Sequence, residues 1–190
     1  MADEKPRILQ GGRDMVLSIG LVVIVTLAVV IPTGLCSWNP GAPEQGPVQE
    51  VDAETFAAME ARVMAFPVRL PDSPDGWITN SARRSSVDAT PAVVIGWVTA
   101  DGGFLQLTQT GETLDDAVRG IDEDPRQLDR TINIAGEEVQ IHTSEESDVR
   151  DLWVVDLGES RALLSGAGTE EEFTTLLEAV ITAEPLPAGE

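Results

Sequence analysis

The sequence of 190 residues contains one histidine, one cysteine and no tyrosine. A single cysteine excludes an internal disulfide, and one histidine with one cysteine excludes a metal or imidazole centre built from several such side chains. His142 alternates with Val139 and Ile141 along a strand-like stretch. We expect it on the opposite, exposed face of that strand, as an ordinary surface residue.

Basic residues are also scarce. The chain has 12 lysines and arginines against 33 aspartates and glutamates, and its formal net charge is −21. Acidic and basic residues balance within residues 1–14, so the remainder carries the whole net charge. Such a surface repels nucleic acid and anionic lipid headgroups, and it attracts basic proteins. We therefore exclude nucleic acid as a partner.

Motifs of catalysis and cofactor binding are missing as well. The chain has no G-x-S-x-G nucleophile turn, and Ser165 in LLSGAG is better interpreted as the end of a strand. Phosphate-binding glycine loops are absent too. The acidic stretch GIDEDPRQLD, with Asp122, Glu123, Asp124 and Asp129, lacks the ligand spacing of a calcium-binding EF-hand loop. We predict that the protein is not an enzyme and uses no cofactor or metal.

One long apolar run stands out against these absences. The stretch MVLSIGLVVIVTLAVVI begins at Met15, and with the residues up to Leu35 it reaches the length of about 20 residues that spans a bilayer. A cleaved signal peptide has a shorter apolar region of about 7–15 residues. A lipoprotein signal needs a small residue where Leu35 precedes Cys36. We predict an uncleaved transmembrane helix at residues 15–35, in contact with the lipid bilayer, and keep both processed forms as alternatives.

The basic residues near this run predict its orientation. Lys5, Arg7 and Arg13 precede it, whereas the first basic residue after it is Arg62. The positive-inside rule then keeps residues 1–14 in the cytoplasm and exports the rest of the chain. We expect a single-pass protein of the cytoplasmic membrane with an extracytoplasmic C-terminal domain.

A linker rich in proline and glycine follows at residues 36–50. Trp38 stands where an interfacial tryptophan is expected, at the outer headgroup level, and Cys36 lies at the same membrane edge. Palmitoylation of Cys36 and an intermolecular disulfide both remain open. The linker separates the exported domain from the membrane surface.

The exported α+β domain is predicted at residues 51–184, followed by a tail at 185–190. Asp52 is a suitable N-cap for a first helix. Its expected core-facing residues, three to four positions apart, are Phe56, Met59 and Val63.

Strand-like stretches occupy most of the remainder, and one opens at Trp77 after the Asp75-Gly76 turn. The others are at residues 92–99, 104–109, 131–134, 139–141, 152–157 and 161–165. Helices with N-caps at Thr113 and Thr169 follow strand pairs in the segments 92–121 and 151–182. The turns between strands are short, which favours antiparallel pairing. The expected fold is two hairpin-plus-helix halves, a mostly antiparallel sheet with helices on one face.

Several segments resemble an actinobacterial membrane-protein family called domain of unknown function 4245. They are RDMVLS, FPVRLP with the following PDGW, IGWVTADGGFLQLTQTG and LWVVDLGESRALLSG. The resemblance covers nearly the whole chain and implies a single-pass envelope protein with an exported α+β domain. It implies no activity and assigns a role to no residue.

The candidate contact residues are therefore few. Trp77, Trp97 and Trp153 are weak candidates for ligand or partner contact, because tryptophans at strand positions more often pack in the core. Two functions remain open. The first is a non-enzymatic interaction module that meets another envelope or membrane protein, and the alternative is a membrane-tethered carrier of a small ligand or lipid, with an apolar cleft between helices and sheet.

Overall fold

The computed structural model describes residues 7–30 and 48–189, with side chains described at 15–26 and 48–189. The first residues of the predicted cytoplasmic segment, the end of the predicted span and most of the predicted linker, with Cys36 and Trp38, lie outside these ranges. The chain divides into two compact units, Met1–Gly46 and Pro47–Glu190. Each is described separately.

Helix α1 (Arg7–Val30) is the described element of the first unit. Its described side chains between Met15 and Val25 are mostly large and apolar, and each of these is about half or more exposed. Among the residues that the structure describes, no helix is long and apolar enough to cross a membrane. Residues 31–35 of the predicted span at 15–35 lie outside the residues that the structure describes.

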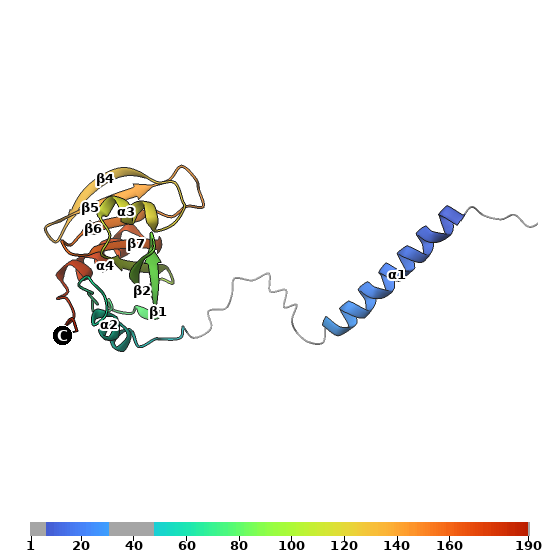
Figure 1. The fold of residues 1–190 in the computed structure, drawn as a ribbon, viewed down its shortest axis with the longest axis horizontal. Coiled ribbons are helices and arrows are strands. Elements are labelled where there is room, and N and C mark those ends of the chain that lie inside the picture. The colour runs from blue at the N-terminus through green and yellow to red at the C-terminus, as the bar shows by residue number, and fades with distance from the viewer. Residues whose placement is uncertain (1–6, 31–47, 190) are drawn as a thin grey trace, which may run out of the picture. The chain divides into compact units, whose positions relative to one another are not determined.

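The second unit is an α+β domain, as the sequence predicts, and it is built on one antiparallel sheet of seven strands (Figure 1). The strands are β1 (Ile78–Val87), β2 (Thr90–Val98), β3 (Phe104–Thr110), β4 (Gln127–Ile134), β5 (Glu137–Thr143), β6 (Leu152–Asp156) and β7 (Arg161–Ala167). Their spatial order is β1-β2-β3-β7-β6-β5-β4. The helices are α2 (Ala53–Ala61), α3 (Leu114–Gly120) and α4 (Glu170–Thr182).

Each half is a meander rather than the predicted hairpin. The first half has three strands before α3, and the second has four before α4. After β3 the chain passes through α3 to the far edge of the sheet at β4, then returns strand by strand until β7 pairs with β3. Tight two-residue turns make this possible: Asp88 and Ala89 have φ of 44° and 66°, and Ala135 and Gly136 have 51° and 94°.

The helices cover both faces of the sheet, so the expectation of helices on one face is wrong. Helices α2 and α4 pack with Trp97, Leu107 and Trp153 in the larger core. Helix α3 packs through Ala117 with Leu152, Val154 and Leu163 on the other face. Neighbouring residues of a strand point to opposite faces, and those of β6 are buried on both. A strand buried on both faces needs a cover on each.

The predicted N-caps are confirmed. Asp52 Oδ1 accepts the Thr55 backbone N–H at 2.9 Å, and Thr113 Oγ1 accepts that of Asp116 at 3.3 Å. Thr169 forms a complete capping box with Glu172. The apolar stripe of α4 is packed against the sheet, with Phe173, Leu176, Leu177 and Val180 buried and Ile181 half-buried.

Helix α2 faces the core with a stripe that only partly matches the predicted one: Phe56 packs against the core, whereas Met59 and Val63 do not. Ala53, Ala57 and Ala61 are buried and Phe56 is half-buried, whereas Met59 is 55% and Val63 is 64% exposed. Alanines four positions apart form a smooth face that lets the helix lie close to the sheet. The two larger apolar side chains are left on the surface.

The first residues of the predicted tail are tied to the domain. Pro185 forms an isolated antiparallel bridge with Arg69, and the Leu186 N–H donates to the Val68 carbonyl at 2.8 Å. The segment 66–71, between α2 and β1, thereby joins the end of the chain to the core.

Candidate functional site

The three tryptophans that the sequence singles out are packing residues. Trp97 is fully buried, and its Nε1 donates to Ser73 Oγ at 3.1 Å. Trp153 is buried with its ring centroid 5.1 Å from that of Phe173 in α4. Trp77 is half-buried against the same core. None of the three lines the surface hollows described below.

His142 is buried, and the expectation of an exposed histidine is wrong. Only 8% of the residue is exposed, because the sheet face that carries it is covered as well. Its Nε2 is 3.0 Å from Gln140 Oε1. Burial lowers the pKa of His142 below its ordinary value, the nearby Arg126 lowers it further, and Asp115 partly offsets both.

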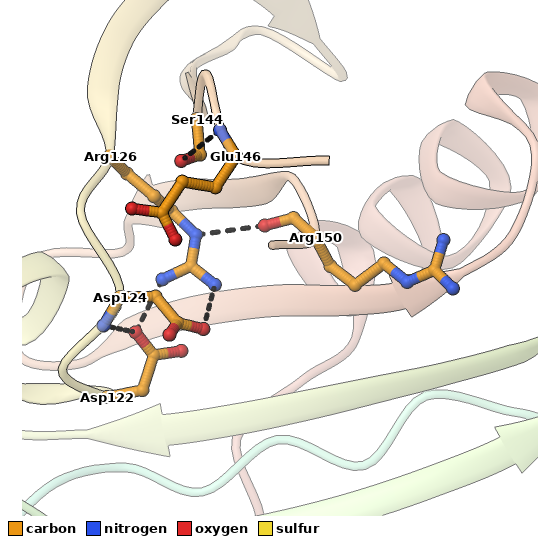
Figure 2. Close-up of polar contacts among 6 residues, drawn as sticks. All are labelled: Asp122, Asp124, Arg126, Ser144, Glu146 and Arg150. Atoms are coloured by element: carbon orange, nitrogen blue, oxygen red, sulfur yellow. Dashed lines mark hydrogen bonds and ion pairs between the residues drawn. The ribbon is translucent and has the colours of Figure 1, made fainter. Parts of the chain in front are cut away.

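Arg126 joins two acidic loops, the one between α3 and β4 and the one between β5 and β6 (Figure 2). Its Nη1 is 2.5 Å from Asp122 Oδ1, its Nη2 is 3.6 Å from Asp124 Oδ2, and its Nε donates to the Arg150 carbonyl at 2.9 Å. The side chain is 4% exposed. Figure 2 shows the guanidinium between the loops, whereas the side chain of Arg150 points away.

The acidic stretch around Asp122 is therefore organised by an arginine. Both carboxylates that contact Arg126 come from the loop between α3 and β4, and the carbonyl comes from the loop between β5 and β6. Within the described parts of the chain, no group of three or more histidine, cysteine, aspartate or glutamate side chains is placed to hold a metal ion.

Beside this cluster lies an acidic surface hollow of about 370 Å³. It is lined by Pro125, Gln127, Leu128, Asp129, Thr143, Ser144, Glu145 and Glu146. A second hollow, of about 510 Å³, lies at the start of α2 and is also rich in carboxylates, among them Glu50, Glu54 and Asp72. Both suit basic rather than acidic partners.

The third hollow differs in character, and we call it the α2 groove. It encloses about 290 Å³ at the C-terminal end of α2. Its lining is Val63, Met64, Ala65, Phe66, Arg84, Thr90, Pro91, Gly111 and Glu159. Most of these residues are apolar or uncharged. Val63, two residues after the end of α2, is exposed, and so is Met59 within the helix.

Arg84 is the basic residue in the lining of the α2 groove. Its Nε lies 2.7 Å from Oε2 of Glu60, a buried residue of α2. The hydrogen bond with Glu60 raises the pKa of Arg84 above its ordinary value. The arginine side chain is still 54% exposed. Among the described residues, no hydrogen bond engages its two terminal nitrogens.

Sequence reasoning missed this groove because it assigned Met59 and Val63 to the core. The signal that could have revealed it is the alanine series at positions 53, 57 and 61, which marks a second possible inner face of α2. The other walls come from β1 at Arg84, the first two residues of β2, the residue after β3 and the turn before β7, which only the fold brings together.

Comparison with known proteins identifies the family. The family described as "Protein of unknown function (DUF4245)" matches residues 7–180, which is most of the chain. Neither the curated proteins nor the solved structures gave a match. The matched span includes α1 and all the strands of the sheet. The chain therefore belongs to the DUF4245 family of proteins of unknown function.

Proposed function

We propose that this protein is a non-enzymatic interaction module of the cell envelope, held at the cytoplasmic membrane by its N-terminal apolar helix. The observation that carries the proposal is the exposed apolar surface of Met59 and Val63 beside the α2 groove. Residues 15–35 contact the bilayer, residues 1–14 stay in the cytoplasm, and the domain meets another envelope or membrane protein outside it.

The exposed side chains suit a docking surface. Removing apolar area from water contributes about 25 cal/mol per Å² of favourable free energy. A partner that covers the exposed side chains of Met59 and Val63 is therefore stabilised in the complex. Methionine and aromatic side chains are enriched where proteins meet. Met64 and Phe66 line the adjoining hollow, which provides a place for an inserted side chain.

The apolar side chains of α1 support the tether. Those between Met15 and Val25 are exposed, and the basic residues near the run all precede it. A lipid environment would cover them, and the charge asymmetry favours a cytoplasmic N-terminus. Attachment to one membrane raises the concentration of the domain near other proteins of that membrane, so contacts of modest affinity are sufficient.

The packed core favours this proposal over the lipid-carrier alternative. The space between α2, α4 and the sheet is filled by side chains such as Trp97, Leu107 and Leu176, which are fully buried. A carrier would need an apolar cleft in that place.

Photo-crosslinking in living cells tests the proposal. A photoreactive amino acid replaces Val63 in the full-length chain, and in a matched strain it replaces Leu128, another exposed apolar residue, from the acidic hollow. We expect a discrete protein adduct from position 63 and none of that mass from position 128. Adducts of identical mass from both positions, or only lipid adducts from position 63, would contradict the proposal.

Protease accessibility tests the topology separately. A protease added to intact spheroplasts should remove residues 51–190 and spare an N-terminal tag. Protection of the domain would show that it does not lie outside the membrane.

A further inference from the structure

The described hollows differ in charge. The acidic hollow is lined by three carboxylates, Asp129, Glu145 and Glu146, and includes no basic side chain. The hollow at the start of α2 also has only acidic charged residues. The α2 groove is lined by one arginine, Arg84, and one carboxylate, Glu159. Of these three, it alone offers a cation to a ligand.

Arg84 has binding capacity that Glu60 does not use. A guanidinium carries five N–H donors, and the contact with Glu60 is made through Nε. Glu60 is buried and fixes the base of the arginine head, while more than half of the arginine side chain stays exposed. An arginine held in this way presents its terminal nitrogens at little further entropic cost.

Other arginines of the domain are occupied differently. Arg119, Arg126, Arg130 and Arg161 pair with carboxylates that do not line the groove. Arg83, the neighbour of Arg84, points to the opposite face of β1 and donates to Gln106 Oε1 at 2.8 Å. Arg84 is thus the arginine that combines unused donors with an apolar groove.

We propose that the α2 groove binds an apolar segment of a partner protein that places one carboxylate against the terminal nitrogens of Arg84. This inference rests on the proposed interaction function. The apolar side chains of the segment cover Met59 and Val63 and enter the hollow beside Phe66. A carboxylate accepts two parallel N–H bonds from a guanidinium, which fixes the register of the segment.

Glu159 limits the number of acidic groups. It lines the same groove, so a second carboxylate near it is repelled. The net charge of −21 also opposes a partner that is acidic overall. The groove therefore selects a single carboxylate among apolar side chains, presented by a protein that is neutral or basic elsewhere.

Selection from a library of random twelve-residue peptides tests this inference, with the full-length chain in lipid nanodiscs as bait. We expect enriched peptides that combine apolar residues with one aspartate or glutamate. Arg84→Glu should reverse the preference to lysine or arginine, and Arg84→Gln should weaken binding of the selected peptides about tenfold. Arg83→Glu is the matched control, because it changes the charge equally on the other face of the sheet, and it should leave the selection unchanged.

The remaining outcomes separate this inference from the proposed function. Enrichment of basic peptides whose binding survives Val63→Glu would overturn the inference and move docking to the acidic hollows. A selection that is unchanged in a folded Arg84→Gln variant would overturn it as well. A full-length dimer that Val63→Glu dissociates would make a second copy the occupant. If no peptide is enriched, the photo-crosslinking experiment distinguishes the two proposals. A protein adduct from position 63 would then overturn the carboxylate inference alone, and the absence of such an adduct would overturn the proposed function as well.

Discussion

The side-chain amide of Gln109 in β3 pairs with both backbone polar groups of Arg69. The Arg69 N–H donates to Gln109 Oε1 at 2.8 Å, and Gln109 Nε2 donates to the Arg69 carbonyl at 2.7 Å. Gln109 is fully buried. Arg69 Nη1 in turn donates to the Ile181 and Ala183 carbonyls at the end of α4. One glutamine thus replaces a strand partner and connects the sheet, the segment 66–71 and the last helix.

Replacing Gln109 with leucine should destabilise the domain strongly. Both backbone groups of Arg69 lose their partner, and each buried polar group left unpaired costs about 1–3 kcal/mol. The urea midpoint of the full-length chain measures the effect. Gln127→Leu, at an exposed position of β4, is the control and should change the midpoint little. Equal midpoints for the two variants would contradict this account of the glutamine.

Substitutions on the two sides of α2 should differ in their effect on stability. Ala57→Leu inserts a larger side chain between the helix and the sheet and should cost about 1–3 kcal/mol. Met59→Gln, on the exposed side, should change stability by less than about 0.5 kcal/mol and weaken the crosslink from position 63. Thermal unfolding measures the first effect and crosslinking yield the second. Destabilisation by Met59→Gln rather than by Ala57→Leu would reverse the assignment of faces.

His142 should make the domain less stable in weak acid. Its pKa is lowered in the folded state from an ordinary value of 6.5, so the unfolded chain binds the proton more readily. The contribution of neutral His142 to stability is therefore fully present above about pH 6.5. It falls as the pH drops toward the lowered pKa of the folded state. Asp52 and Asp116, whose pKa values are lowered from 3.8 by hydrogen bonds from Thr55 and Thr113, titrate below this window.

The variant His142→Asn should remove the loss of stability between pH 7.5 and 5.5. Urea unfolding at both pH values, with the wild-type chain in parallel, measures this. A wild-type chain that is more stable at pH 5.5 than at 7.5 would refute the assigned direction.

Arg126→Met should free the two acidic loops. The substitution leaves Asp122 and Asp124 without their cation and the Arg150 carbonyl without its donor. We expect a loss of about 1–3 kcal/mol, since the carboxylates are partly exposed. Hydrogen exchange should become faster at residues 121–126 and 144–151.

The pKa of His142 should rise in the same variant, because a nearby cation no longer lowers it, and a histidine NMR titration would detect this. Arg150→Met is the control, since only its backbone carbonyl accepts from Arg126, and it should change none of these three readouts.

Local physical chemistry explains why much of the fold could be predicted from the sequence. A cap such as Asp52 or Thr169 acts on backbone groups two or three residues away, so its partner is visible in the sequence. Alternation in β3 and the apolar stripe of α4 are likewise properties of one segment. Short turns restrict neighbouring strands to antiparallel pairing.

The candidate site could not be predicted in the same way. The α2 groove joins Val63, Arg84, Pro91 and Glu159, which come from four separate parts of the chain. The sequence offered two possible inner faces for α2, and periodicity alone favoured the wrong one because it ranks larger apolar side chains above alanine. The tryptophans stood out as rare residues, yet rarity does not distinguish packing from contact.

The sequence by itself determined the class of the fold, the helix starts, the antiparallel pairing and the family, because each depends on short-range patterns or on recognisable segments. Only the tertiary structure decided that α3 covers the face opposite α2 and α4, that His142 is buried, and that Met59 and Val63 remain at the surface. Those outcomes depend on which surfaces meet after β7 pairs with β3. Burial is a property of the assembled sheet and its two covers, and a pattern within one segment shows which side chains share a face but not which face the rest of the chain covers.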